Sequence, residues 1–515
     1  MPMTAPKLPK SNQEMDALER IFNALDLASH GHIFKKGLLE ALGNRGILEN
    51  DTRIRQTTLA LAKYKQKEKI TLPLFRQLVG QHITLIEKAL TGNLVIPDFK
   101  NFASFIENLY NRTLQNKRGE VSDYIPQLAQ VEPQHYALSV CTVDGQRFNI
   151  GDCSKKYLAR ETANAINYCA ALKEHDIQYV HERVGRAPKE SGFDYLMLNR
   201  DGMPHNPLTG SGALLVSSLV KKSAAIENIW KEMSGGVTPA VNDGAYKAEK
   251  LVADRDRALA YFMQQKRLFA KGADVEQHLE FLWRSHAIET TTEIQAVMAA
   301  TLANAGVCPT NEREVFTPTI AKHCLSIMLM AGMQDYSSEY AFSVGLPAVS
   351  GSSGVVLIIV PDVMGIAIWS PRIDAMGNSI KGLDFSQKLV DRFNFHNFDS
   401  SIKNVNKVDP RLKKNETKMK GVMAVTSAAS IGDLDELQRL YAAGADLNEG
   451  EYDKRTGIHL AASEGHLAAV KFFIEKNVDI NPKDRWGGTP LADAKREGHK
   501  AVLELLKKHG GTEKA

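Results

Sequence analysis

Serine and lysine residues one helical turn apart are the first candidates for chemistry in this chain. A serine hydroxyl becomes a nucleophile when a base takes its proton, and a lysine amine at that spacing can do so. Ser218 and Lys221 have this spacing, whereas Ser154 is followed directly by two lysines, which do not share its face of a helix. Ser154 and Ser350 are therefore nucleophile candidates only if a base lies near them. No histidine among the fifteen has an aspartate at a recognisable catalytic spacing.

Residues 26–37 have the length and the turn of a calcium-binding loop. Asp26 and Gly31 occupy the first and sixth positions, which normally hold a carboxylate ligand and the glycine of the sharp turn. The third, fifth and twelfth positions hold alanine, histidine and glycine, so one carboxylate is left among those ligands. The pattern predicts a helical hairpin of this type without bound calcium, and no metal site or cofactor is predicted elsewhere.

Length and composition indicate an ordinary water-soluble protein of two to four domains. The 515 residues are 43% apolar and 24% charged, with a net charge of +4 and five cysteines without metal-type spacing. The longest apolar run, residues 354–360, is too short to cross a membrane. The first residues have neither an apolar signal core nor an arginine-rich amphipathic segment, which favours the cytoplasm. Mitochondrial location stays open if the sequence has been trimmed.

Apolar spacing, a basic segment and an internal repeat divide the chain into four parts. Residues 1–113 have helical periodicity, whereas residues 114–402 combine helices with two hairpins, one of which turns at Asp144-Gly145. Residues 403–422 are a basic linker, interpreted mainly as a solvated connector and alternatively as a contact with an anionic surface. In residues 423–515, Gly-Asp or Gly-His pairs recur every 33 residues, and Thr456 and Thr489 share that spacing. The middle unit also contains Thr-x-x-His-x-Ala, so the pattern predicts ankyrin repeats that bind protein.

Several long segments carry a resemblance to a known family. They are "DYIPQLA" (123–129), "VCTVDGQR" (140–147), "VMAATLANAGVCP" (297–309) and "GNSIKGLDF" (377–385). With the order of domains, they resemble the animal kidney-type and liver-type glutaminases, which hydrolyse glutamine to glutamate and ammonia. The resemblance implies an EF-hand-like all-α domain, a central α/β serine β-lactamase-like domain with an antiparallel sheet, and C-terminal ankyrin repeats.

The catalytic pair of that family is absent at the matching positions. The resemblance places a Ser-x-x-Lys pair where this chain has Glu161 and Asn164. A carboxylate attacking an amide would have to form a mixed anhydride, and an amide side chain cannot accept a proton. The resemblance also assigns Ser218 to a scaffold helix, so no catalytic residue is predicted. Together these replacements predict a pseudoenzyme.

The substrate-binding positions implied by the resemblance are also largely altered. Two match the family, Tyr124 and Glu249. Six are altered, namely Gly210, Asp256, Leu282, Gln334, Val349 and Ser352. A backbone oxyanion donor at Ser352 can survive, because an N–H group does not depend on the side chain. Glu161, Glu249 and Asp256 are expected on one cleft, where three carboxylates need a cation or raised pKa values.

Assembly and partners follow from the same resemblance. The family forms dimers, tetramers and filaments through a loop whose counterpart supplies the interface candidates Phe193, Tyr195, Leu196 and Met197. The prediction is a non-catalytic oligomeric scaffold or regulator in glutamine metabolism, which co-assembles with active glutaminases. Two alternatives stay open: an active glutaminase that uses other residues, and a binder of nucleic acid or an anionic surface through the basic linker.

Overall fold

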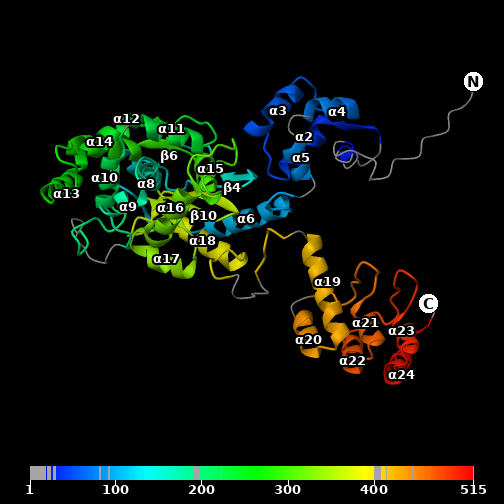
Figure 1. The fold of residues 1–515 in the computed structure, drawn as a ribbon. Coiled ribbons are helices and arrows are strands. Elements are labelled where there is room, and N and C mark those ends of the chain that lie inside the picture. The colour runs from blue at the N-terminus through cyan, green and yellow to red at the C-terminus, as the bar shows by residue number, and fades with distance from the viewer. Residues whose placement is uncertain are drawn as a thin grey trace, which may run out of the picture. The chain divides into compact units, whose positions relative to one another are not determined.

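The chain forms two compact units, residues 1–403 and residues 404–515 (Figure 1). The computed structural model describes residues 30–513 except 80–82, 91–92, 189–197, 222, 400–406, 413 and 443–444, together with four single positions between 19 and 26. Within these described residues, no helix is long and apolar enough to cross a membrane.

A short antiparallel ladder and four α-helices form the described part of the first domain. β1 (His32–Phe34) pairs with β2 (Lys69–Thr71), and Ile33 lies opposite Ile70. The other elements are α2 (Lys35–Gly43), η1 (Thr52–Ile54), α3 (Arg55–Ala62), α4 (Leu72–Val79) and α5 (Ile83–Leu90). α2 is the second helix of the predicted hairpin, and most of the first helix lies outside the described residues.

The one acidic side chain kept in the candidate calcium loop is bonded by its own loop. The Asp26 carboxylate accepts hydrogen bonds from the backbone N–H groups of His30, at 3.0 Å, and of Gly31, at 2.7 Å. Gly37, at the last loop position, lies inside α2 and has no side chain to offer. Backbone donors therefore satisfy the carboxylate that would have been the first calcium ligand.

A five-stranded antiparallel sheet forms the centre of the next domain. Its order is β5, β4, β11, β10, β9, with bounds β4 (Ala137–Thr142), β5 (Arg147–Gly151), β9 (Ala348–Gly351), β10 (Val355–Val360) and β11 (Met364–Trp369). The two predicted hairpins meet where β4 pairs with β11, and Val140 lies opposite Ile366. All residues of β4, β10 and β11 are buried, so the antiparallel sheet expected from the apolar runs is confirmed.

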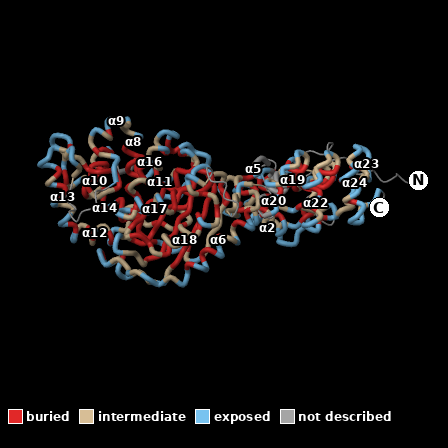
Figure 2. Tube along the Cα trace, turned by 90° about the horizontal axis from the view of Figure 1, so that it is seen from below, coloured by how far each residue is buried: buried red, intermediate tan, exposed pale blue. Residues whose placement is uncertain are grey.

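Helices cover both faces of this sheet. α15 (Thr292–Ala303) packs so closely on β11 that a Cβ on Gly365 would lie 2.2 Å from the nitrogen of Ala300. α18 (Ile380–Arg392) packs on the opposite face, where a Cβ on Gly382 would lie 2.8 Å from Val356. Figure 2 shows the buried residues concentrated inside this domain, with exposed residues along its outer loops.

The remaining elements of the first unit surround this core. The helices are α6 (Phe99–Leu114), α7 (Pro126–Ala129), α8 (Thr162–Glu174), α9 (Ile177–His181), α10 (Gly210–Leu219), α11 (Ser223–Met233), α12 (Asp243–Val252), α13 (Asp254–Gln265), α14 (Val275–His286), α16 (Pro318–Ala331), η3 (Gln334–Tyr336) and α17 (Ser337–Ser343). Two short ladders pair β3 (Glu120–Val121) with β12 (Arg372–Ile373), and order β6 (Tyr157–Leu158), β8 (Ile288–Thr290) and β7 (Ala240–Val241) as β6-β8-β7.

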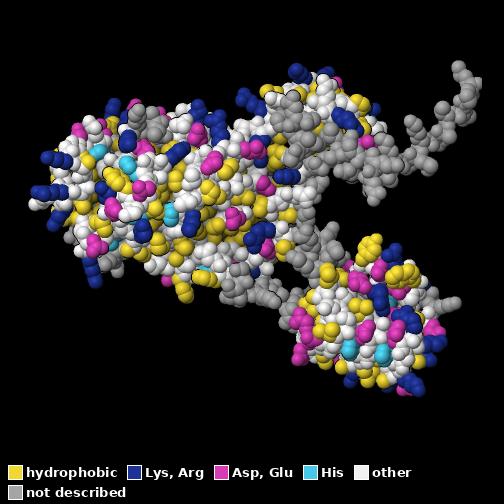
Figure 3. Space-filling model, viewed as in Figure 1, with side chains coloured by type: hydrophobic (Ala, Val, Ile, Leu, Met, Phe, Trp, Pro, Cys, Tyr) yellow, Lys and Arg dark blue, Asp and Glu magenta, His cyan; other side chains and the backbone are white. Residues whose placement is uncertain are grey.

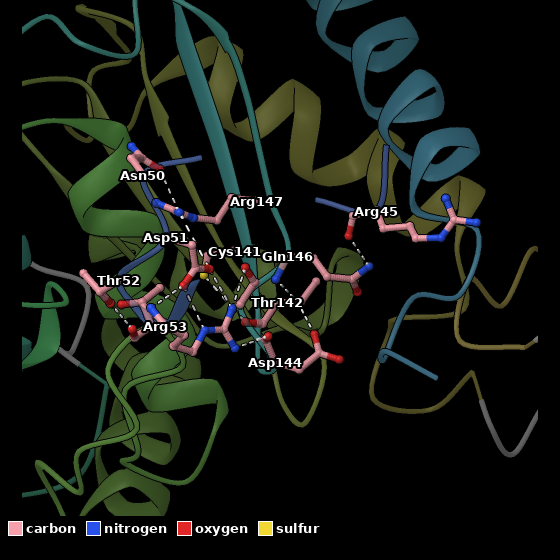
Figure 4. Close-up of polar contacts among 12 residues, drawn as sticks. Arg45, Asn50, Asp51, Thr52, Arg53, Cys141, Thr142, Asp144, Gln146 and Arg147 are labelled. Atoms are coloured by element: carbon pink, nitrogen blue, oxygen red, sulfur yellow. Dashed lines mark hydrogen bonds and ion pairs between the residues drawn. The ribbon is translucent and has the colours of Figure 1, made fainter. Parts of the chain in front are cut away.

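The EF-hand-like domain forms hydrogen bonds with the turn between β4 and β5 (Figure 4). Arg53 donates two hydrogen bonds to the buried carboxylate of Asp51, at 3.0 and 2.8 Å, and a third to the carbonyl of Asp144 at 2.7 Å. Gln146 donates to the carbonyls of Arg45, at 2.9 Å, and Ile96, at 3.0 Å. The two domains are therefore joined by directed polar contacts at one turn.

The second unit consists of three stacked helix pairs. They are α19 (Lys414–Ile431) with α20 (Leu434–Ala442), α21 (Gly457–Ser463) with α22 (Leu467–Glu475), and α23 (Pro490–Arg496) with α24 (Lys500–Lys508). His466 Nε2 lies 2.9 Å from the carbonyl of Ser430, and 33 residues later His499 Nε2 lies 2.9 Å from that of Ser463. The predicted ankyrin array is confirmed, and α19 begins inside the segment expected to be a linker.

Arg53→Ala tests the contact between the EF-hand-like domain and the turn between β4 and β5. The change removes the hydrogen bond from Arg53 to the carbonyl of Asp144 across the interface. It also leaves the buried Asp51 carboxylate without its bidentate partner, which typically costs about 3 kcal/mol. We expect a loss of that order in the free energy of unfolding, measured by urea denaturation. Arg45→Ala is the control, because its side chain donates to the carbonyl of Ala41 in α2, directly before it in the same domain, and a change within about 0.5 kcal/mol is expected. Equal losses in the two variants would contradict this account of the interface.

Candidate functional site

A single pocket of about 270 Å³ gathers most of the positions expected from the sequence. It lies among α8, α10, α12, α13 and α14 and the turn after β9. The expected positions that line it are Tyr124, Glu161, Asn164, Gly210, Glu249, Asp256, Leu282 and Ser352. Eight residues that were not expected line it as well: Arg160, His286, Ala213, Leu214, Val252, Arg255, Leu259 and Leu279.

The other expected positions do not line this pocket. Gln334 begins η3 with a left-handed φ of 54°, and Val349 is buried in β9 opposite Leu357. The four interface candidates, Phe193, Tyr195, Leu196 and Met197, lie outside the described residues. Their assignment to a subunit interface stays a prediction.

Arg160 is the centre of the polar network in the pocket. Its guanidinium is almost fully buried and donates to Glu249 at 2.5 Å and to Ser352 Oγ at 3.1 Å, and it lies 3.5 Å from Glu161. It also lies 5.4 Å from the centre of the Tyr124 ring. Because two carboxylates flank one guanidinium, the cation that they require is part of the chain.

Strand pairing explains how Arg160 reaches this place. The ladder of β6 and β8 continues past β6, since the N–H of Arg160 bonds to the carbonyl of His286 at 3.1 Å. Arg160 then adopts a left-handed φ of 49°, which costs a non-glycine residue about 1–2 kcal/mol, and α8 begins two residues later. The ionic contacts of the side chain offset this cost and hold the turn that presents Glu161.

The Glu161 carboxylate occupies the backbone donor expected at Ser352. It accepts the N–H of Ser352 at 2.7 Å and the Ser352 hydroxyl at 3.0 Å. Burial alone would raise the pKa of Glu161, but the Arg160 guanidinium and the Ser352 N–H stabilise the charged form and hold that pKa below its ordinary value. The donor is present, and an internal anion already uses it.

The Glu249 carboxylate is also paired inside the protein. It is 1% exposed, and His286 Nδ1 lies 3.3 Å from it while His286 Nε2 lies 3.0 Å from Asn164 Oδ1. Burial would raise the pKa of Glu249, yet Arg160 and His286 lower it to about 2. Of the two possibilities, a cation or raised pKa values, the structure has the first for Glu161 and Glu249, because the chain supplies Arg160.

The third expected carboxylate is separately satisfied. Asp256, in the first turn of α13, accepts a hydrogen bond from the indole nitrogen of Trp283 at 3.0 Å. Among the described residues, no group of three or more His, Cys, Asp or Glu side chains could hold a metal ion.

The alternative serines have different environments. The Ser218 hydroxyl donates to the carbonyl of Leu215 in its own helix, and the buried Ser350 hydroxyl donates to Asn378. Ser352 has a carboxylate beside its hydroxyl, but Glu161 is a weak base because its pKa is lowered. A general base works best when its pKa lies near the working pH. The Ser352–Glu161 pair is therefore poorly suited to nucleophilic attack.

Comparison with known proteins identifies the central domain. Residues 119–398 match the model of the glutaminase family. The chain belongs to the glutaminase family. Residues 17–97 match an EF-hand domain, and residues 425–514 match three ankyrin repeats.

Named glutaminases are similar to most of the chain. The mitochondrial liver isoform of mouse glutaminase is 36% identical over 479 residues, which cover 90% of this chain and 79% of that protein. Microcystis aeruginosa glutaminase is 33% identical over 316 residues, which cover 60% of this chain and 92% of that protein. The solved structure of the probable glutaminase ybaS aligns with a TM-score of 0.54 and 27% identity, over 57% of this chain and 97% of that one.

Glu249→Gln tests whether the buried network is held by charge. The neutral amide leaves Arg160 buried without its closest carboxylate, so we expect a loss of about 3 kcal/mol in the free energy of unfolding at pH 7. Because the folded-state pKa of Glu249 is about 2 and that of an unfolded glutamate is about 4.3, its contribution is complete above pH about 4.3. It declines as the pH falls towards 2.

Urea unfolding at a series of pH values measures this difference between the wild-type protein and the variant. Glu280→Gln is the control, because Glu280 pairs with Lys250 at the surface and its loss changes stability little. A wild-type advantage that persists unchanged down to pH 2 would refute an ionic origin.

Proposed function

We propose that this member of the glutaminase family is a pseudoenzyme that acts as an oligomeric scaffold or regulator. The observation that carries the proposal is the Glu161 carboxylate, which takes the Ser352 N–H and is joined through Arg160 to Glu249. A substrate carbonyl that needed this donor would have to displace an internal anion. The residues that stand at the catalytic positions thus block the site as well as lacking the chemistry.

The chemistry itself supports the proposal. Hydrolysis of a carboxamide through an acyl intermediate needs an activated nucleophile, and Glu161 is an ionised carboxylate held by hydrogen bonds. Asn164, one turn later, has no proton-accepting amine and contacts His286 through its Oδ1. Loss of both nucleophile and base lowers turnover by about 10⁶-fold in a well-studied hydrolase.

Substrate recognition is affected as well. The glutamate implied by the resemblance to bind substrate, Glu249, is neutralised inside the protein by Arg160. Leu282 supplies an apolar surface where the resemblance implies a tyrosine hydroxyl. A zwitterionic amino acid in this pocket would therefore contact the Arg160–Glu249 ion pair and the apolar side chain of Leu282.

The retained scaffold supports a role in assembly. The core strands, the EF-hand-like domain and the ankyrin array are all present. The changes that the resemblance implies fall on the pocket, except those at Gln334 and Val349. We propose the domain limits 1–113, 114–402, 403–422 and 423–515. The protein forms dimers, tetramers or filaments through residues near 193–197. It also co-assembles with active glutaminases in the cytoplasm. A protein partner bound by the ankyrin repeats completes the proposal.

The nucleic-acid alternative gains no specific support. Figure 3 shows basic and acidic side chains interspersed over the visible face of the described residues. Nucleic-acid binding normally requires a concentrated basic surface. In the basic linker, Arg411 is bonded to Asp409 at 2.8 and 2.9 Å.

Ammonia release from glutamine tests the loss of catalysis. We expect no turnover above the uncatalysed background from the purified protein. The double variant Glu161→Ser, Asn164→Lys should restore little, because Arg160 still neutralises Glu249. Adding Arg160→Gln to the double variant removes that block and should give the higher rate of the two. Sustained glutamate production by the unmodified protein would refute the proposal.

The oligomeric state is tested by light scattering on the eluate of a sizing column. Each chain has a mass of 56.9 kDa, and we expect a particle of at least two chains that persists on dilution. The same measurement after mixing with an active glutaminase tests co-assembly, because mixed particles change the mass distribution. A monomer at all concentrations would contradict the scaffold role.

A further inference from the structure

We infer that the altered pocket binds a neutral small molecule with an apolar body, in place of a zwitterionic amino acid. The inference rests on the proposed loss of glutaminase function and concerns the same pocket. It follows from how the charges, the apolar side chains and the mouth of the pocket are arranged.

The acidic side chains in the pocket already have internal partners. Glu161 and Glu249 share Arg160, and Asp256 accepts the indole N–H of Trp283. Arg255, a further cation in the lining, is exposed and has a contact of its own. A charged ligand would lose part of its hydration and would have to compete with one of these contacts for a counter-ion. Removing a partner from a buried ion pair is strongly unfavourable, so these contacts favour a ligand without net charge.

One wall of the pocket consists of buried aliphatic side chains. They are Leu214, Leu259, Leu279 and Leu282. Each of them is at most 4% exposed, so their positions are fixed by packing in the core. An apolar cavity of about 150 Å³ can hold benzene. A pocket of about 270 Å³ therefore has room for an aromatic ring that carries a small polar group.

Tyr124 gives the pocket a neutral hydrogen-bonding group. Tyr124 lines the pocket and is 40% exposed. Burial and the nearby carboxylates Asp256 and Glu249 raise the pKa of Tyr124 above its ordinary value, so it stays a hydroxyl at neutral pH. An apolar pocket with few polar groups is the usual form of a small-molecule site.

The mouth of the pocket continues the apolar surface outward. Val252, the last residue of α12, lines the pocket and is 48% exposed. Its neighbour Leu251 is 81% exposed and does not line the pocket. An apolar ligand that extends through the mouth would cover Val252, whereas Leu251 would be unaffected.

Calorimetric titration with probes of equal size and different charge tests the inference. Benzyl alcohol is neutral, benzylamine is a cation and benzoate is an anion at pH 7, and L-glutamine is the zwitterion. We expect saturable binding of benzyl alcohol, at least about tenfold tighter than any of the charged probes, a difference equivalent to about 1.4 kcal/mol. Equal or tighter binding of a charged probe, or no saturable heat from benzyl alcohol, would overturn the inference.

Two adjacent substitutions locate the binding. Val252→Asp puts a charge at the mouth and should weaken benzyl alcohol binding by at least about fivefold, since the ligand must pass or cover that side chain. Leu251→Asp, one residue away, should leave the affinity within about twofold of the wild-type value. Circular dichroism of both variants verifies folding, and equal effects of the two would place the ligand elsewhere.

Ammonia release, measured on the same preparations, separates this inference from the proposed function. If benzyl alcohol does not bind and glutamine is not hydrolysed, the inferred ligand class is wrong and the proposed function stands. Turnover of glutamine by the wild-type protein overturns the proposed function.

Discussion

The buried ion pair of Arg160 with Glu249 is the interaction on which the pocket depends. Without the guanidinium, two carboxylates would face each other in a water-poor cleft, and at least one would have to become protonated. With it, both stay ionised, and the turn before α8 is held in its left-handed shape. The same contacts that keep the site folded keep its binding groups occupied.

Buried ion pairs of this kind are costly to form and more costly to break. Desolvation of the charges is offset only when geometry and additional hydrogen bonds are good, as they are for Arg160 with its three partners. A scaffold that no longer binds substrate can retain such a pair, because the pair is satisfied without any ligand. The domain therefore needs no bound small molecule to complete this pair.

Much of the fold could be predicted from local patterns in the sequence. The hairpins follow from apolar runs and the Asp144-Gly145 turn, and the ankyrin array follows from its 33-residue period. The positions of Glu161, Asn164 and Glu249 could be placed in one pocket by resemblance. Gln334 and Val349 do not line that pocket, because η3 and β9 leave their side chains elsewhere.

The role of Arg160 could not be predicted, because its partners are distant in the chain. It is separated by 89 residues from Glu249, and Asn164 is separated by 122 residues from His286. The ladder of β6 and β8 brings these segments together, and strands of two or three residues have almost no pattern of their own. One sequence signal could have indicated this role of Arg160. It is a single arginine after a short apolar stretch, directly before Glu161.

The carboxylate of Glu161 has a consequence for how the protein responds to its surroundings. Glutaminases release a molecule whose side chain ends in the same group, and here that group is tethered next to the Ser352 N–H. A tethered group acts at an effective concentration that free ligands seldom match. A dissolved carboxylate such as glutamate would therefore have to displace a tethered group to reach this donor.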